Sequence, residues 1–269
     1  MKLSDAVKVL ADAGVENPRY DAREIFTRIG GIPLSALVFP DTECTVPDLL
    51  SAIERRKARE PLQYIIGEVD FYREKYKVTP DCLIPRQDTE ILVDFAVKNI
   101  SEGKKFLDLC TGSGCIAVST LKNTKNTAAV ALDISAGALS LARHNAEKNG
   151  VSDRINFVLA DALENAVPGE FYAILSNPPY VSEAAYKELE PEIYFEPKNA
   201  FVGGESGLDF YCGILSLYKD RISPDGFFAF EIGYDQAEEI TKIASEFGMK
   251  TEIIKDLSEN DRVAVIKRP

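Results

Sequence analysis

The chain has 269 residues, of which 45% are hydrophobic and 28% are charged, and its formal net charge is −12 at pH 7. This composition is typical of a globular protein that is long enough for one α/β domain and a smaller one. The negative charge argues against a nucleic-acid backbone as the main partner, because phosphates would be repelled.

Cysteine, histidine and hydropathy patterns exclude further classes. The five cysteines are scattered and never spaced C-x-x-C, so neither a disulfide framework nor a metal site is expected. The single histidine, His144, lies in the polar segment HNAEKN, which argues against Ser/His or Cys/His catalysis. No apolar run approaches the ~18 residues of a membrane span, and the N-terminus does not resemble a signal peptide. A cytoplasmic protein without membrane contact is therefore expected.

Residues 1–60 are predicted to form a small helical bundle. Apolar residues recur at helical spacing before Gly14, again from Pro18 to Ile29, and again after Pro47. Three short helices are too small to be stable alone, so this bundle is expected to depend on the rest of the chain. The basic cluster at residues 55–59 is consistent with a solvated helix face or with a surface for a partner.

Residues 61–82 are predicted to be a linking β-hairpin, because β-forming residues alternate around Arg73-Glu74-Lys75. A helix capped by Asp88 or Thr89 is expected to follow, with an apolar face made of Ile91, Leu92, Phe95 and Val97. The large domain is therefore assigned to residues 83–269.

From residue 104 onward, predicted strands alternate with predicted helices. This order is typical of an open parallel sheet covered by helices, and a last antiparallel strand is expected at Val263–Ile266. The fold class is therefore α/β.

The first strand of this series leads into the glycine-rich loop Asp108-Leu-Cys-Thr-Gly-Ser-Gly114. Gly112 and Gly114 allow a tight turn and a close approach of the backbone to a ligand. The same spacing fits a nicotinamide-dependent oxidoreductase, because Ala117 completes G-x-G-x-x-A and Asp133 follows about 20 residues later. The loop alone therefore does not distinguish a nicotinamide cofactor from S-adenosyl-L-methionine.

Three acidic residues at successive strand ends favour S-adenosyl-L-methionine. Asp108 suits an amino group better than a pyrophosphate, which it would repel. Asp133 is expected to accept the two ribose hydroxyls, and Asp161 the adenine amine. Ligands of open α/β sheets bind at this carboxyl edge.

A short apolar strand at residues 171–175 leads into Ser176-Asn177-Pro178-Pro179-Tyr180. The two prolines fix two φ angles and remove two backbone donors, so the loop is stiff. The Asn177 Oδ1 and the Pro178 carbonyl are suited to accept both hydrogens of a planar NH2 group, and the Tyr180 ring is suited to pack on its plane.

In this order, these motifs resemble class I S-adenosyl-L-methionine-dependent methyltransferases that act on a planar nitrogen. More narrowly, the chain resembles the protein-(glutamine-N5) methyltransferases of peptide chain release factors. The narrower match is carried by Pro61–Glu68, Phe71-Tyr72, Ile84–Glu90, Glu196-Pro197, Ala200, Gly203–Tyr211 and Asp261–Val263. The resemblance implies a Rossmann-like sheet of seven strands, mostly parallel with one antiparallel strand, preceded by a small helical domain and a hairpin.

The resemblance also implies the residues of the site and the partner. Catalytic roles fall to Asn177, Pro178 and Tyr180, and Pro179 joins them in binding the substrate. The expected cofactor-binding residues are Asp108, Cys110, Thr111, Gly112, Ser113, Gly114, Asp133, Asp161, Ala162 and Asn177. The expected substrate is the glutamine of the Gly-Gly-Gln motif in class I release factors, bound by a monomer that does not bind nucleic acid directly.

One alternative stays open, because Asn-Pro-Pro-Tyr is shared with methyltransferases of nucleic-acid amino groups such as adenine N6. There are also departures from the family pattern. Cys110 stands where the family usually has a glycine, so a left-handed backbone is reached less easily there. Ala162 is smaller than the apolar residue that some members place beside adenine.

Overall fold

The computed structural model describes all 269 residues, which form two compact units. The first comprises Met1–Glu68 together with Glu190–Phe195. The second comprises Val69–Leu189 and Glu196–Pro269. A short segment from the second half of the chain is thus part of the N-terminal unit.

The first unit is a helical bundle, as the sequence predicts. Its helices are α1 (Leu3–Asp12), α2 (Pro18–Arg28), α3 (Pro47–Lys57), α4 (Leu62–Ile66) and the 3-10 helices η1 (Ala36–Val38) and η3 (Pro191–Phe195). Apolar side chains from α1 to α4 form one buried core, in which Ile25 and Phe26 are fully enclosed. Pro18 and Pro47 each begin a helix, where a missing N–H costs nothing.

Residues 62–66 differ from the prediction of a hairpin that begins at Pro61. They form helix α4, because Leu62 and Ile65 complete the bundle core and Gly67 ends the helix in the left-handed conformation. The hairpin itself is confined to β1 (Glu68–Phe71) and β2 (Glu74–Lys77). Its turn residues, Tyr72 and Arg73, both have positive φ, as a two-residue type I′ turn requires.

The basic cluster at residues 55–59 is neither a purely solvated face nor a free surface. Arg56 is buried, and its Nε donates to Asp21 at 2.6 Å while its Nη2 donates to Glu192 at 2.9 Å. Arg59 donates to the same Glu192 carboxylate. These ion pairs explain why Glu190–Phe195 belongs to the first unit.

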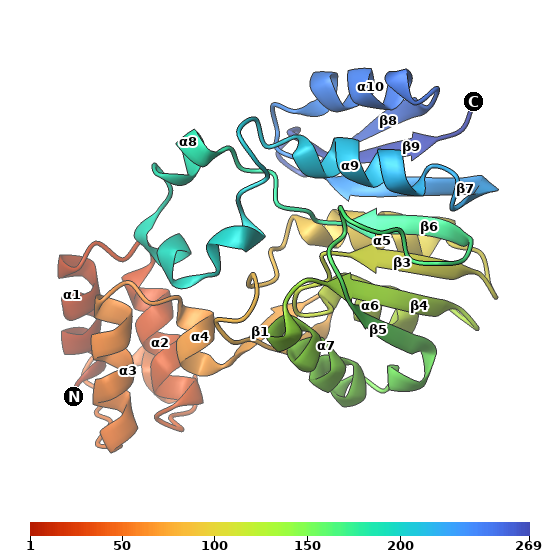
Figure 1. The fold of residues 1–269 in the computed structure, drawn as a ribbon. Coiled ribbons are helices and arrows are strands. Elements are labelled where there is room, and N and C mark those ends of the chain that lie inside the picture. The colour runs from red at the N-terminus through yellow and green to blue at the C-terminus, as the bar shows by residue number, and fades with distance from the viewer. The chain divides into compact units, whose positions relative to one another are not determined.

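The second unit is built on one sheet with the strand order β5-β4-β3-β6-β7-β9-β8 (Figure 1). Only β9 runs antiparallel to its neighbours, which confirms the predicted mixed sheet of seven strands. The strands are β3 (Lys105–Leu109), β4 (Ala128–Asp133), β5 (Ile155–Leu159), β6 (Phe171–Ser176), β7 (Ile222–Glu231), β8 (Lys250–Lys255) and β9 (Asp261–Lys267). The helices are α5 (Thr89–Asn99), α6 (Cys115–Asn123), α7 (Ala136–Lys148), α8 (Glu183–Tyr186), α9 (Asp209–Tyr218), α10 (Ala237–Glu246) and the 3-10 helices η2 (Ser152–Arg154) and η4 (Lys198–Ala200).

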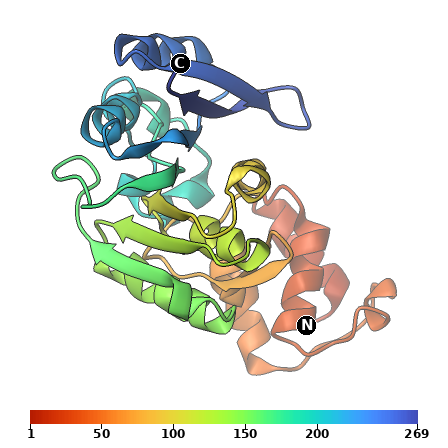
Figure 2. The ribbon, with the colours of Figure 1, turned by 90° about the vertical axis from the view of Figure 1, so that its right-hand side faces the viewer.

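The sheet has an apolar core on each face, because alternate residues of a strand point to opposite sides. Phe106 and its neighbours pack with α5 and α6 on one face. Leu107 and Leu109 pack with α9 and α10 on the other. Figures 1 and 2 show α9 and α10, in blue, gathered beside the C-terminal strands.

The buried face of helix α5 overlaps the predicted one and is centred to one side of it. Leu92, Val93 and Ala96 are fully enclosed, whereas Ile91 and Phe95 are only partly buried. Neither predicted cap forms a side-chain capping bond, since Asp88 makes none and the Thr89 hydroxyl donates elsewhere. None of the helices combines the length and the hydropathy that crossing a membrane requires.

The strand order determines where a ligand is expected to bind. The chain runs from β3 outward to β4 and β5, and then returns to place β6 on the other side of β3. At such a reversal the loops after neighbouring strands diverge and leave a crevice at the carboxyl edge. Leu109 pairs with Ser176, so the loops after β3 and β6 begin side by side.

Candidate functional site

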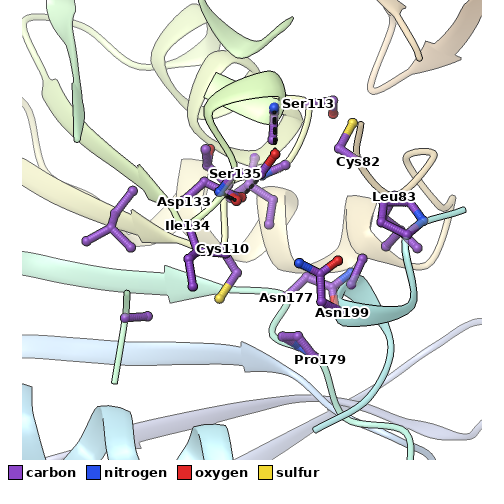
Figure 3. A pocket seen from close by; sticks show the side chains of 18 of the residues that line it. Cys82, Leu83, Cys110, Ser113, Asp133, Ile134, Ser135, Asn177, Pro179 and Asn199 are labelled. Carbon is purple, nitrogen blue, oxygen red and sulfur yellow. Dashed lines mark hydrogen bonds between the residues drawn. The ribbon is translucent and has the colours of Figure 1, made fainter. Parts of the chain in front are cut away.

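A pocket of about 240 Å³ opens at this crevice, within the second unit. This volume is many times the ~10–15 Å³ that one water requires. Figure 3 shows Asp133 and Ser135 on one side, Asn177, Pro179 and Asn199 on another, and Cys110 between them. The loops after β3, β4, β5 and β6 thus contribute to a single site.

The glycine-rich loop has the tight backbone that its sequence predicts. Cys110, Gly112 and Gly114 have φ values of 58°, 54° and 80°. Cys110 therefore occupies the left-handed region despite its side chain, at a cost of about 1–2 kcal/mol. Gly114 serves helix packing, because a Cβ there would lie 3.0 Å from the Cβ of Ala142 on α7.

Asp108 lies beneath this loop and does not line the pocket. Its Oδ2 accepts hydrogen bonds from Thr111 Oγ1 at 2.5 Å and from the Ala117 amide at 3.1 Å. Complete burial raises the pKa of Asp108 to about 7. Its Oδ1 has no partner within the protein. The geometry gives Asp108 a role in holding the loop, and its binding of an amino group stays a prediction.

Asp133 and Asp161 both line the pocket, at the ends of β4 and β5. Asp133 accepts the Gly112 amide at 2.8 Å through Oδ2 and the Ser135 amide at 2.9 Å through Oδ1. Asp161 accepts the Leu163 amide at 2.8 Å. Because each carboxylate oxygen has a second lone pair, both residues can still accept hydrogens from a ligand.

The thiols that surround the pocket are poor nucleophiles. Cys82, Cys110 and Cys115 all line it, and burial raises the pKa of each thiol. They therefore remain protonated at neutral pH, and the thiolate is the reactive form. This arrangement favours an acceptor that enters the pocket from outside the protein.

The Asn-Pro-Pro-Tyr loop reaches the same pocket through Asn177 and Pro179. Ser176 anchors its beginning by donating to the Leu109 carbonyl at 2.7 Å. Asn177 Nδ2 donates to Thr89 Oγ1 at 3.2 Å, so the carboxamide is held from behind. Pro178 is buried but does not line the pocket.

Tyr180 lies behind the pocket wall. Its hydroxyl donates to Glu231 Oε1 at 3.4 Å, and its carbonyl accepts from Gln236 Nε2 at 3.0 Å. Burial, reinforced by Glu231, raises the pKa of Tyr180, so the phenol stays neutral. The predicted packing of its ring on a substrate amide stays a prediction.

Two residues that the sequence did not assign to the site connect its parts. Thr89 lines the pocket and donates to Glu231 Oε2 at 2.6 Å, across 142 positions of the chain. Glu231 ends the apolar strand β7 and is only 2% exposed. A carboxylate at the end of an apolar strand is the same signal that identified Asp133 and Asp161, and it was present in the sequence.

Glu196 joins two of the segments that line the pocket. Its buried carboxylate accepts the Ile84 amide at 2.8 Å and also pairs with Arg86. Two neighbouring carboxylates also have partners, because Asp88 forms an ion pair with Arg262 at 3.3 Å and Glu90 accepts a hydrogen bond from the Tyr72 amide at 2.8 Å. Arg86, Asp88 and Glu90 therefore connect the Ile84–Glu90 segment to Glu196, to β9 and to the turn of the hairpin.

The structure brings most of the predicted site residues to one pocket. Those that line it are Cys110, Thr111, Gly112, Ser113, Asp133, Asp161, Ala162, Asn177 and Pro179. Those that do not line it are Asp108, Gly114, Pro178 and Tyr180. Its polar groups combine the carboxylate acceptors of Asp133 and Asp161 on one side with the Asn177 carboxamide on the other. This set fits S-adenosyl-L-methionine, which carries hydroxyl and amino groups, next to a second ligand with an NH2 group.

Comparison with known proteins covers both parts of the chain. Residues 2–67 match the family described as PrmC N-terminal domain, and residues 87–196 match the family described as Methyltransferase small domain.

Several curated relatives carry the name release factor glutamine methyltransferase, including the following two. The protein of Thermodesulfovibrio yellowstonii is 37% identical over 277 aligned positions, which cover 100% of this chain and 99% of the relative. That of Geobacter sulfurreducens is 36% identical over 244, which cover 89% and 85%. A solved methyltransferase structure from Pyrococcus furiosus aligns with a TM-score of 0.54 and 20% sequence identity. The alignment covers 71% of this chain and 86% of the Pyrococcus chain, and it supports the fold alone.

Proposed function

This chain belongs to the release factor glutamine methyltransferase family, and we propose that it methylates the side-chain amide nitrogen N5 of a glutamine in class I peptide chain release factors, within their Gly-Gly-Gln motif. The methyl donor is S-adenosyl-L-methionine. Because the acceptor is a protein of translation, the reaction belongs to the cytoplasm.

The observation that carries this proposal is the pairing of Leu109 with Ser176. It brings the beginning of the glycine-rich loop next to the beginning of the Asn-Pro-Pro-Tyr loop. A ligand held by the first loop and an amide held by the second therefore meet in one pocket, at the carboxyl edge of the sheet.

We assign the cofactor to Asp133, Asp161 and the loop of Gly112 and Ser113. Asp133 and Asp161 accept hydroxyl and amino hydrogens, and the tight turn at Gly112 lets the backbone of the loop approach the ligand closely. When bound, S-adenosyl-L-methionine supplies an electrophilic methyl group on a positively charged sulfur. Asp108 orients the loop from below through Thr111 and Ala117.

The acceptor amide is assigned to Asn177 and Pro178. One N–H of the glutamine amide is assigned to the Asn177 Oδ1, which lines the pocket, and the other to the carbonyl of Pro178, which lies between the pocket-lining residues Asn177 and Pro179. An amide nitrogen is a weak nucleophile, because its lone pair is delocalised into the carbonyl. Alignment of the nitrogen with the methyl carbon is therefore the main contribution of the protein, and such alignment supplies at most about 7–11 kcal/mol.

The two acceptors also stabilise the positive charge that develops on the N–H groups as the new N–C bond forms. The nitrogen gains one methyl group and loses one proton, which passes to water. No side chain of the pocket is required as a strong base, which agrees with the absence of histidine from it.

The test is a reaction of the purified protein with S-adenosyl-L-methionine and a class I release factor, followed by mass spectrometry of a digest. We expect a gain of one CH2 on the Gly-Gly-Gln glutamine, and its loss in Asn177→Ala, which should still bind S-adenosylhomocysteine. A parallel reaction with DNA and RNA tests the nucleic-acid alternative. Methylation of nucleic acid without methylation of release factor would overturn the proposal.

A further inference from the structure

A buried hydrogen-bond relay runs from β7 to the Asn-Pro-Pro-Tyr loop. The Glu231 carboxylate accepts the Thr89 hydroxyl at 2.6 Å, and Thr89 Oγ1 accepts Asn177 Nδ2 at 3.2 Å. The second oxygen of Glu231 accepts the Tyr180 hydroxyl at 3.4 Å. Both ends of the loop are thus connected to one carboxylate.

The chemistry of these groups fixes the direction of every bond in the relay while Glu231 is ionised. An ionised carboxylate has no hydrogen, so Glu231 can then only accept. Thr89 has a single hydroxyl hydrogen, which it gives to Glu231, and it therefore offers only lone pairs to Asn177. The Asn177 carboxamide must then present its NH2 to Thr89, because its Oδ1 there would face another oxygen with no hydrogen between them.

We propose that Thr89 and Glu231 are positioning residues for methyl transfer, which hold the Asn177 carboxamide with its oxygen toward the acceptor amide. This inference rests on the proposed role of Asn177 in binding the glutamine. It assigns the specificity for an NH2 substrate to Thr89 and Glu231 as well as to Asn177 itself.

The relay is needed because a carboxamide is nearly symmetric in shape. A rotation of about 180° about the last side-chain bond exchanges oxygen and nitrogen with little change in packing. In the rotated form Asn177 would offer hydrogens to the hydrogens of the substrate amide. Only the hydrogen-bond direction set by Thr89 distinguishes the two forms.

The Thr89 hydroxyl does not serve as a cap at the start of α5. The residue before it, Asp88, makes no side-chain capping bond, and Thr89 itself gives its hydrogen to Glu231. Thr89 is 2% exposed and lines the pocket, so its hydroxyl is placed between the reaction site and the buried carboxylate. The relay thus serves the carboxamide.

The decisive comparison is Thr89→Val against Thr89→Ser. Valine keeps the shape but removes the hydroxyl, which leaves Asn177 Nδ2 and Glu231 without this partner. We expect kcat with release factor to fall about tenfold to hundredfold in Thr89→Val, with little change in KM, and Thr89→Ser to retain most of the wild-type kcat. Calorimetry with S-adenosylhomocysteine is expected to give similar Kd values for all three proteins.

A second readout does not depend on activity. In nitrogen-15 NMR spectra, the side-chain NH2 signals of Asn177 are identified by their loss in Asn177→Ala. We expect their chemical shifts to be alike in the wild type and Thr89→Ser and displaced in Thr89→Val, because one hydrogen has lost its acceptor. Thermal melting verifies that each variant is folded.

Equal kcat in Thr89→Val and Thr89→Ser would overturn the inference, and so would unchanged Asn177 signals in a folded Thr89→Val. A loss of activity in proportion to a loss of S-adenosylhomocysteine affinity would also overturn it, since Thr89 would then act through the cofactor pocket. Failure of the proposed function is a separate result, because the wild type itself would then not methylate the release factor.

Discussion

Gly203 lies against the backbone carbonyl of Pro179, so closely that a Cβ on Gly203 would be 2.2 Å from that oxygen. The Gly203 amide also donates to the Val181 carbonyl at 3.0 Å. Gly207 has the same relationship to Tyr180, whose carbonyl oxygen would lie 2.2 Å from an added Cβ. The glycine-rich segment after β6 therefore supports the Asn-Pro-Pro-Tyr loop from outside the pocket.

Gly203→Ala is expected to displace this loop, since backbone atoms cannot move aside as a flexible side chain can. We predict a loss of methyl transfer of at least about a hundredfold, because shifts of about 1 Å in a reacting geometry have effects of that size. Steady-state kinetics with a release factor measures it. Gly150→Ala is the control, because a Cβ there faces open space, and any effect of its own positive φ would be unrelated to the Asn-Pro-Pro-Tyr loop. Equal activities of the two variants would contradict the prediction.

Asp133→Asn tests the cofactor side of the pocket. An asparagine there can accept only one of the two backbone hydrogens, and its NH2 would face either the Gly112 or the Ser135 amide. We predict that S-adenosylhomocysteine binds about tenfold to hundredfold more weakly, measured by calorimetry. Asp153→Asn is the matched control, because it makes the same change of charge at an exposed residue of η2. If both variants bind like the wild type, Asp133 does not hold the ligand.

Glu231→Gln is expected to change the dependence of stability on pH. Burial raises the pKa of Glu231 to about 7 from its ordinary value of 4.5; Arg262, Thr89 and Tyr180 counteract this rise, whereas Asp88 adds to it. The folded protein therefore holds this proton more tightly than the unfolded chain. Its stabilising contribution is complete below pH 4.5 and is lost as the pH rises through 7.

Glutamine has no such proton to lose. As the pH rises from 5 to 8, the wild type should therefore lose stability that Glu231→Gln keeps, so the variant becomes more stable relative to the wild type. The difference in melting temperature between the two proteins, measured at both pH values, checks this. A difference that stays constant with pH would show that Glu231 does not titrate in this range.

Arg56→Met tests the ion pairs of the first unit. Asp21 is buried, and burial raises its pKa even though Arg56 is bound to it. Removing the guanidinium leaves two carboxylates near each other, at a cost of about 3–5 kcal/mol. Hydrogen exchange of the α2 and α3 amides is expected to become faster, whereas β3 and β6 should be little affected. The double variant Arg56→Met, Asp21→Leu should regain part of the protection from hydrogen exchange, because it no longer contains the unpaired Asp21 carboxylate. If the methionine acted only by its shape, the second substitution would restore nothing.

The sequence by itself determined most of the order of elements and several residues that line the pocket. Hydrophobic runs, helix-starting prolines and the last antiparallel strand are local signals, and the strand-end acids Asp133 and Asp161 follow from topology, because parallel strands end at one edge. The stiffness of Asn177-Pro178-Pro179-Tyr180 is equally local, since a proline ring fixes its own backbone angle.

Only the tertiary structure decided what stands behind that loop. Thr89 and Glu231 are 142 positions apart, and no periodicity in the chain brings a helix start to the end of a distant strand. The same holds for Asp108, which is hydrogen-bonded beneath the loop, and for α4, whose apolar residues belong to the bundle core. The physical reason is that backbone preferences act over a few residues, whereas a buried polar group takes its partner from whatever element the packing brings within reach.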